Sequence, residues 1–448
     1  MRTMSAAERL SIDIWYTSRM RYKLFGLIVV TLSACSVPSP DVGVAAQGVT
    51  EGLTVLHTFG AGEGIAPRGA LAEVNGRLYG LNGEGGPNAT ANCNSTANWN
   101  TDAHIKHCPG ALFSLALDGS GFRVEHAFTQ LDDNGRNLDG YHPYGSLAVG
   151  PDGTLYGVTQ TGGAPPVGID PDHSLIPGYG VLFSFNPATQ TFTTLHTFFA
   201  VARALDGEYP MGLVAVDADG NVYGTAKGGG STSTGTVWRC SPGGQFLASP
   251  LPGETYGGVV LAQSLLHGTT WANGANQVGD YFTVDISTMA VTVVASFPGY
   301  TANDHGTDNT PIQAPTALSS GAIIASREFG GSHGTGLVVG LSPSTGITVL
   351  HDSDDIPLDA VPRFANTTGG MLNGGLAEGR DGLVYGTAQY GGSNGTGGIY
   401  RIAPDGSLFQ LVFSFADSAY PYGGLILGSD GAFYGMEFGT GMVFRFVP

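Results

Sequence analysis

Acidic and amide side chains cluster in the segments that separate the apolar stretches of this 448-residue chain. Asp132, Asp133 and Asn134 stand together and are followed by Gly135. Carboxylate and amide oxygens suit Ca²⁺ or Mg²⁺, although this run lacks the full spacing and the terminal Glu of a calcium loop. Asp and Asn side chains also close turns on their own backbone. Two interpretations therefore stay open for these three residues: a divalent-cation site, or solvated turn formers.

Histidine and aromatic side chains occur in the same kind of segment. A lyase or hydrolase could use His142, His173 or His305 as its general base, with a metal held by loop aspartates to assist. A binding protein could instead stack aromatic rings on sugar faces while acids accept hydrogen bonds from hydroxyl groups. The candidates for ligand binding are Trp99, Asp139, Tyr141, His142, His173, Asp206, Tyr209 and His305. Both aspartates of this set are followed by Gly, which also fits turn formers that recur in each repeat.

The composition narrows the function classes. The chain has 36 Asp+Glu against 18 Lys+Arg, and its net charge of −18 argues against binding to nucleic acid, which needs a basic surface. Only 12% of the residues are charged, which excludes a coiled coil and a charged disordered chain. Gly, Thr, Val, Tyr and Phe are prominent, and they favour short strands joined by tight turns.

Residues 1–34 are expected to be a signal peptide, and the export pattern itself lies in the second half of this segment. Arg19, Arg21 and Lys23 precede an apolar run at 24–34. That run has about 11 residues, too few to cross a bilayer and typical of a signal peptide. Because residues 1–19 fit no export pattern, we expect the true start at Met20.

The run ends in Leu32-Ser33-Ala34-Cys35, which resembles the lipobox of bacterial lipoproteins. This resemblance implies that Cys35 is lipidated and becomes the mature N-terminus, with residues 35–52 as a tether. An ordinary signal peptide with a chance Cys is the alternative. We therefore expect an anchored protein in the outer membrane or at the surface of a bacterium.

Two cysteines share one loop with two histidines. Cys93 and Cys108 flank His104 and His107. In an exported protein a disulfide is the default expectation. Cys and His are also zinc ligands, but this spacing matches no standard finger. Cys240 would be left without a partner and is expected to be a buried, inert thiol.

A repeated pattern is the strongest signal in the chain. Asn75-Gly76 stands four residues before Tyr79-Gly80, and Asn-Gly or Asp-Gly between apolar stretches predicts a hairpin turn. The same offset recurs at Asp152-Gly153, Asp219-Gly220, Asp381-Gly382 and Asp430-Gly431. Weaker copies occur at His267-Gly268-Thr269 and Ile324-Ala325-Ser326. This makes seven units, and in His267 the anchor Tyr is replaced by a residue that we expect to pack inside its unit.

Each unit continues with two more predicted strands, such as 181–185 and 192–198. Four antiparallel strands repeated seven times indicate an all-β fold, a seven-bladed β-propeller spanning 53–448 as a single domain. The last unit stops at its third strand, 444–446, whereas 53–59 reads like a fourth strand. We therefore predict that the N-terminal strand completes the last blade and closes the ring.

The repeat residues resemble a known family. The relevant segments are Leu155-Tyr156-Gly157-Val158-Thr159 with Gly162-Gly163, Val222-Tyr223-Gly224-Thr225 with Gly235-Thr236-Val237-Trp238, and Val384-Tyr385-Gly386-Thr387 with Gly391-Gly392. They are similar to the repeat core of the bacterial GloVer-type tandem-repeat proteins, which are exported and carry several kinds of surface anchor. The resemblance covers most of 53–448. It implies a propeller fold and an exported location, and it brings no catalytic residues.

The insertions predict one working face. Connections between first and second strands, and between third and fourth, are short, whereas the long segments fall in the other two kinds, for example 87–110, 164–179 and 351–372. Function gathers on loops held by a rigid frame. The first hypothesis is a monomeric, lipid-anchored propeller that binds a carbohydrate, peptide or protein ligand. The alternatives are a metal-assisted lyase or hydrolase, so catalysis is left open, and a structural surface module without a pocket.

Overall fold

The computed structural model describes most of the chain from residue 52 onward. The described residues are 52–60, 62–90, 93, 108–132, 136–163, 178–199, 205–271, 276, 278–298, 314–328, 330–331, 335–353, 366–372, 374–416 and 419–448. They contain strands and no α-helix, so among them no helix could cross a bilayer. The all-β expectation is confirmed.

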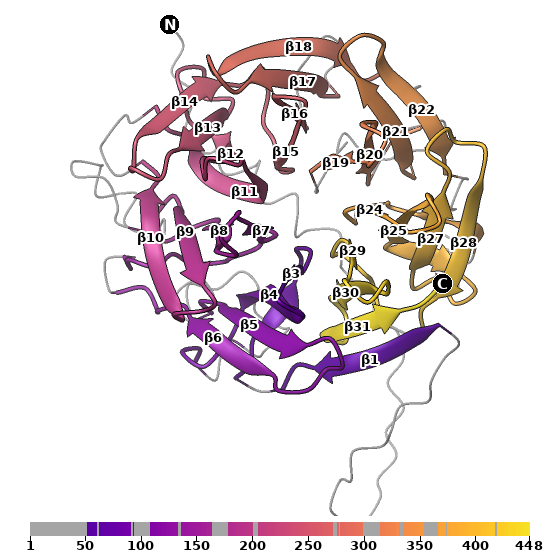
Figure 1. Cartoon of the computed structure of the whole chain (residues 1–448), viewed down its shortest axis with the longest axis horizontal. Helices are drawn as coiled ribbons and strands as arrows, with labels where there is room; N and C mark the ends of the chain where they lie inside the picture. Colours follow the sequence, from indigo (N-terminus) through magenta and orange to yellow (C-terminus); the bar gives the residue numbers. More distant parts are fainter. Residues whose placement is uncertain are drawn as a thin grey trace, which may run out of the picture. The chain divides into compact units, whose positions relative to one another are not determined.

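Seven antiparallel sheets of four strands form the blades of a β-propeller around a central axis (Figure 1). From the axis outward, the first three blades are β3 (Ala72–Val74), β4 (Arg77–Glu84), β5 (Ala111–Ala116), β6 (Arg123–Ala127); β7 (Ala148–Val149), β8 (Leu155–Thr159), β9 (Val181–Asn186), β10 (Thr191–Thr197); and β11 (Glu208–Val216), β12 (Val222–Gly228), β13 (Thr236–Cys240), β14 (Phe246–Pro250).

The next three blades have the same order. They are β15 (Val259–Ala262), β16 (Leu265–Thr269), β17 (Asp280–Asp285), β18 (Ala290–Ser296); β19 (Thr316–Ala317), β20 (Ile323–Arg327), β21 (Leu337–Ser342), β22 (Gly346–Asp352); and β24 (Ala377–Glu378), β25 (Val384–Ala388), β27 (Gly398–Ile402), β28 (Phe409–Ser414). The units that match the repeat least well thus form ordinary fourth and fifth blades.

The seventh blade joins the two ends of the propeller. It consists of β29 (Ile426–Leu427), β30 (Phe433–Glu437), β31 (Met442–Phe446) and, outermost, β1 (Leu53–Thr58). β1 pairs antiparallel with β31, Leu53 opposite Phe446 and Val55 opposite Phe444. In Figure 1 the first strand, in indigo, lies along the last, in yellow. The predicted closure by the N-terminal strand is confirmed.

Short additional strands extend the blades where strand 1 begins. β2 (Ile65–Pro67) pairs with the end of β4, and β23 (Asn366–Gly370) pairs with β26 (Tyr390–Gly392). In the third blade the same arrangement is continuous: β11 pairs with β12 along both halves, with a register shift between Met211 and Ala215. Each of these first strands therefore has an entry half and an axial half.

The Tyr-Gly pair of the repeat is explained by a cross-strand contact. The glycine of the second strand lies opposite an aromatic residue of the third, as Gly224 lies opposite Trp238. A Cβ on Gly224 would fall 2.3 Å from the Trp238 ring. The other pairs are Gly80/Phe113, Gly157/Phe183, Gly268/Phe282, Gly386/Tyr400 and Gly435/Phe444. The ring covers the glycine, which leaves no room for a larger residue at that position.

The tyrosine of the pair has its own structural role. The Tyr385 hydroxyl donates to Asp381 at 2.7 Å and the Tyr434 hydroxyl donates to Asp430 at 2.9 Å, each four residues earlier, whereas the Tyr223 hydroxyl donates to Asp217, six residues earlier. In the fourth blade His267 replaces the tyrosine, is buried, and lies 2.7 Å from the Tyr281 hydroxyl. The expectation that His267 packs inside its blade is confirmed.

The apolar core lies between neighbouring blades. One cluster joins Phe198 of the second blade to Trp238 of the third, and another joins Tyr385 of the sixth to Phe433 of the seventh. Each blade is buried on both faces by its neighbours, which makes the ring a rigid frame for the connections between strands.

Candidate functional site

The topology separates two kinds of connection. In an antiparallel blade successive turns alternate between the two ends of the strands, so the connections from strand 2 to strand 3 share one face with those that enter the next blade. All the long insertions belong to these two kinds. We call this side of the propeller the loop face.

Two of the candidate aspartates cap outer strands of the blades. Asp139 accepts hydrogen bonds from His126 at 3.0 Å and from the Thr129 backbone N–H at 2.9 Å. Asp206 has the equivalent place in the next blade, 2.8 Å from the His196 imidazole. Both carboxylates are largely buried, with 13% of the side chain exposed. Their oxygens thus hold the chain in place, and the turn-former interpretation describes their geometry.

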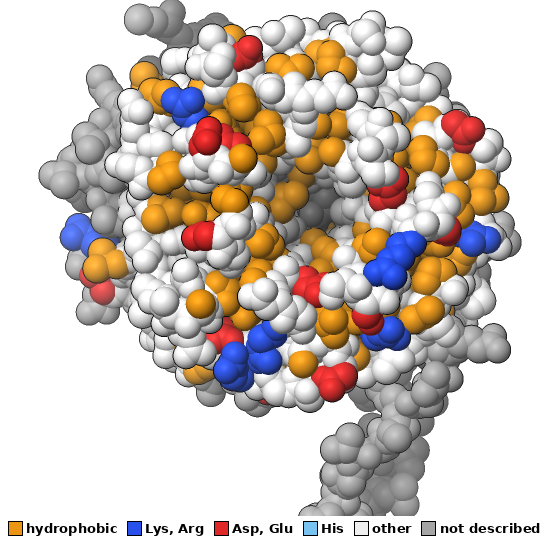
Figure 2. All heavy atoms as spheres, in the orientation of Figure 1, with side chains coloured by type: hydrophobic (Ala, Val, Ile, Leu, Met, Phe, Trp, Pro, Cys, Tyr) orange, Lys and Arg blue, Asp and Glu red, His pale blue; other side chains and the backbone are white. Residues whose placement is uncertain are grey.

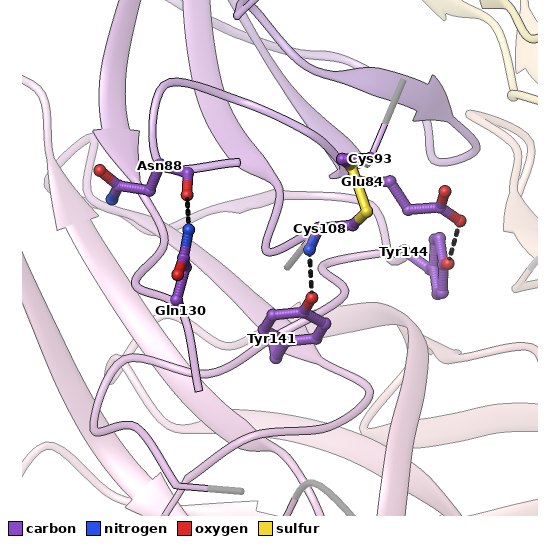
Figure 3. Close-up of a disulfide and its surroundings, with 7 residues drawn as sticks. All are labelled: Glu84, Asn88, Cys93, Cys108, Gln130, Tyr141 and Tyr144. Carbon is purple, nitrogen blue, oxygen red and sulfur yellow. Dashed lines mark hydrogen bonds between the residues drawn. A yellow bond between two sulfur atoms is a disulfide. The ribbon is translucent and has the colours of Figure 1, made fainter. Parts of the chain in front are cut away.

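Tyr141 is fully buried, so its ring does not line an open surface. Its hydroxyl accepts a hydrogen bond from the Cys108 backbone N–H, beside the disulfide that joins Cys93 and Cys108 (Figure 3). In the same view the Tyr144 hydroxyl donates to Glu84 at 2.5 Å. The first insertion and the end of β4 are therefore each tied to the start of the second blade.

His142 and Tyr209 occupy equivalent places just before a proline. Both have positive φ, 55° and 57°, in the left-handed region where non-glycine residues carry strain. The His142 ring lies 5.3 Å from the ring of Tyr144, and the Tyr209 ring lies 5.4 Å from that of Tyr179. These two candidates do lie on the loop face, where blades begin.

The metal candidates are only partly described. Asp132 accepts from the Arg136 backbone N–H at 2.9 Å and so closes a short loop. Within the described residues no group of three or more His, Cys, Asp or Glu could hold a metal ion. Six predicted residues lie outside the described part of the chain: Cys35, Trp99, Asp133, Asn134, His173 and His305. Cys240 is buried, and burial raises the pKa of its thiol.

A ring of glycines narrows the channel where the blades begin. A Cβ on Gly69 would lie 2.2 Å from the carbonyl oxygen of Gly145, and one on Gly145 would lie 2.6 Å from that of Gly212. Across the closure, a Cβ on Gly423 would lie 2.6 Å from the carbonyl oxygen of Gly69. Only glycine fits where neighbouring backbones approach this closely. We use the name glycine ring for Gly69, Gly145, Gly212, Gly257, Gly374 and Gly423.

Thr or Ser residues of the second strands hold the glycine ring through hydrogen bonds. Thr225 donates to the Gly257 carbonyl at 2.9 Å, and Thr387 donates to the Gly423 carbonyl at 3.0 Å. Ser326 makes the same bond to Gly374 at 2.8 Å. Each bond crosses from one blade to the next, so the ring is held by the strands around it.

The residue before each glycine of the ring varies. In six blades these positions hold Arg68, Tyr144, Met211, Tyr256, Asn373 and Tyr422, of which Asn373 is not described. The described ones are all half-buried. We call them the mouth residues, and we include in this name Lys227, Trp271 and Phe438, which lie at or just after the ends of second strands. Figure 2 shows one end of the axial channel as a hollow in the centre of the propeller.

On one side of the mouth a cation is surrounded by aromatic rings. The guanidinium carbon of Arg68 lies 4.6 Å from the centroid of the Tyr144 ring, 5.2 Å from that of Phe438 and 5.8 Å from that of Tyr422. Burial and the neighbouring Glu84 carboxylate raise the pKa of Tyr144 well above its ordinary value. The phenol thus stays neutral and keeps donating to Glu84.

On another side of the mouth a lysine lies over a ring. The Lys227 ammonium is 4.7 Å from the centroid of the Tyr256 ring. The Tyr256 and Trp271 rings are 5.3 Å apart and nearly perpendicular, at 88°. Two aromatic walls at a right angle, with a cation beside them, form a corner that could seat a flat or chair-shaped ring.

None of the mouth residues was among the eight predicted candidates for ligand binding. Their signal lies in the recurring Pro-x-Gly at 67–69, 143–145, 210–212 and 421–423, where the middle residue changes between repeats. A variable residue between a recurring Pro and Gly indicates the position at which the blades differ in chemistry.

Comparison with known proteins gives a family and a fold. The family model described as the Gloeobacter/Verrucomicrobia repeat matches residues 44–238, 95–338 and 256–448. No curated protein matches the chain. The extracellular domain of a putative one-component system from B. thetaiotaomicron is similar in structure, with a TM-score of 0.52 and 10% identity over 88% of this chain and 40% of that chain.

A GH74 enzyme from Niastella koreensis has a TM-score of 0.48 and 13% identity, over 86% of this chain and 53% of that one. This chain spans about two fifths of the length of the B. thetaiotaomicron protein. At these identities a likeness shows the fold alone.

Proposed function

The chain belongs to the Gloeobacter/Verrucomicrobia repeat family, and from this premise we propose that its propeller is a lipid-anchored binding module of the bacterial cell envelope. In this proposal the ligand is a carbohydrate, and it binds at the channel mouth on the loop face. The propeller fold and the repeat family fit a binding or structural module at a surface. The anchor is supported by the Leu-Ser-Ala-Cys run that ends at Cys35.

The observation that carries the proposal is the composition of the mouth. Aromatic rings and cations occupy variable positions directly beside the glycine ring, and part of each side chain is exposed. Aromatic faces stack on the C–H faces of sugars, while hydroxyl and amine groups at their edges make directed hydrogen bonds. The rigid frame would hold these rings ready for a ligand, which reduces the entropy lost on binding.

A glycan array tests this proposal. We expect the full chain, purified from membranes in detergent, to bind a limited set of oligosaccharides. Tyr256→Ala should weaken binding at least tenfold, because stacking on one ring is lost. Tyr179→Ala is the matched control, since Tyr179 is a half-buried aromatic of the loop face outside the mouth.

The outcomes separate the hypotheses. Loss of binding in the Tyr179 variant and not in the Tyr256 variant would move the site away from the mouth. Shortening of a bound oligosaccharide, detected by mass spectrometry, would favour the lyase or hydrolase. An array on which nothing binds would favour a structural module.

A further inference from the structure

We propose that the channel mouth selects oligosaccharides that carry carboxylate groups, with Lys227 as the residue that pairs with the carboxylate. This inference rests on the proposed carbohydrate-binding function and adds the chemical class of the sugar, a uronic acid. Tyr256 and Trp271 would form the surface on which the sugar ring packs.

Lys227 stands at a position that no other blade fills with a cation. It is the third residue after the Tyr-Gly pair, and the equivalent residues are Gly83, Gln160, Trp271, Glu328, Gln389 and Phe438. The described part of the chain contains no second lysine. The positive charge at this place therefore distinguishes the third blade from the others.

The ammonium of Lys227 has capacity for a ligand. Among the described residues it makes no hydrogen bond or ion pair, and it lies over the face of the Tyr256 ring. An ammonium group has three N–H donors and no acceptor. A π-face attracts the charge but does not take up directed hydrogen bonds as a carboxylate does. A carboxylate beside the ring would satisfy donors that the ring leaves open.

The overall charge of the chain does not prevent this pairing. The net charge of −18 repels a polyanion at long range. At physiological ionic strength the Debye length is about 8 Å, so distant acids are screened, whereas an ion pair in contact with Lys227 is not. Recognition should therefore depend on the local cation and weaken as salt is added.

The two rings favour a sugar over an acidic peptide. Tyr256 and Trp271 meet at 88°, and a pyranose can place one face on the first ring and an edge on the second. The side chain of Asp or Glu brings a carboxylate without such a face, so it would use only the charge. An acidic peptide is therefore the competing occupant that the test must separate.

The test uses three probes on the full chain in detergent: a galacturonic acid oligosaccharide, its methyl ester and a poly-glutamate peptide. By calorimetry we expect the acid to bind about fivefold to tenfold more tightly than the ester. Lys227→Met should abolish that preference and leave the affinity for the ester unchanged. Lys227→Arg should retain it, and Arg136→Met, which removes an exposed cation elsewhere on the loop face, should have no effect.

Each contrary result has a distinct meaning. Equal affinity for acid and ester in the wild-type chain would overturn this inference while the proposed function stands. Poly-glutamate that binds as tightly as the uronic acid oligosaccharide would overturn the sugar class. A chain that binds neither these probes nor any glycan on the array would instead remove the proposed function itself.

Discussion

His126 lies flat on Phe192, although the two residues belong to the outer strands of different blades. Their ring centroids are 3.8 Å apart and the planes differ by 6°. The same stack recurs between His57 and Phe122, His196 and Phe246, and His351 and Phe409, at 3.9, 3.7 and 3.5 Å. Each stack joins one blade to the next, so the same stabilising contact recurs between outer strands around the propeller.

The histidine is presented by an irregularity in the outer strand. In β10 the pairing register shifts between Thr194 and His196, and in β1 it shifts between Val55 and His57. A bulge adds one residue to a strand and re-aims the side chain that follows. The imidazole can then stack on the next blade and reach the acid at the start of that blade, as His196 reaches Asp206.

His196→Ala should destabilise the propeller by about 2–4 kcal/mol. The change removes a ring stack and leaves the largely buried Asp206 carboxylate without its imidazole partner. Urea denaturation followed by tryptophan fluorescence measures the loss. A double-mutant cycle with Asp206→Asn should show coupling, because the two side chains act on each other. If the changes in unfolding free energy of the two substitutions simply add, the two side chains do not stabilise the propeller through their mutual contact.

Weaker pairing between β1 and β31 should lower the thermal stability of the propeller. Leu53→Asp places a charge at a buried position opposite Phe446 and should weaken the pairing of β1 with β31. Thr54→Ala is the control, since Thr54 is exposed on the same strand. We expect a melting temperature several degrees lower for the first variant only. Equal melting temperatures would contradict closure by this strand.

Gly69→Ala should disturb the mouth. Its Cβ would lie 2.2 Å from the Gly145 carbonyl oxygen, so one of the two backbones must move. We expect a loss of about 2–4 kcal/mol in unfolding free energy. Gly243→Ala is the control, because the nearest atom to its Cβ would be 3.9 Å away. A Gly69 variant as stable as the control would show that the ring is not tightly packed.

Glu437 should make stability depend on pH. Burial raises the pKa of its carboxyl to about 7, from 4.5. Between these values the folded chain keeps a proton that the unfolded chain has lost, so the unfolding free energy falls as pH rises from about 4.5 to about 7, by up to about 1.4 kcal/mol per unit. Glu437→Gln should flatten this slope. Parallel pH curves for wild type and variant would exclude the effect.

Much of the propeller fold could be predicted because the repeated residues determine local structure. Asn-Gly or Asp-Gly specifies a turn, and alternating apolar residues specify strands, so a strand was predicted at 181–185, where β9 spans Val181–Asn186. The entry strands β2, β23 and β26 were not predicted. They pair through their backbones, and with three to five residues each they are too short to show an alternating pattern.

The candidate site was harder to predict for a related reason. Tyr141 and Tyr144 are both loop tyrosines in the sequence, and only the fold shows that the first is fully buried and the second is half-buried at the mouth. The position before the glycine has no preferred residue type, since Arg, Tyr, Met and Asn all occur there in the sequence. The Pro and Gly on either side of it recur, so the repeat can be recognised from the sequence. The residue between them varies and gives no sequence signal of its own.

The fifth blade suggests how the cross-strand pair of the repeat can be exchanged. There Ala325 lies opposite Val339, where other blades place a glycine opposite an aromatic ring. Gly224→Ala alone should cost about 2–4 kcal/mol, because the new Cβ would lie 2.3 Å from the Trp238 ring. Adding Trp238→Val relieves that clash but leaves a cavity. Denaturation should therefore show that the double variant is more stable than the sum of the two single changes predicts. If the two changes simply add, the glycine is required by something other than the ring that covers it.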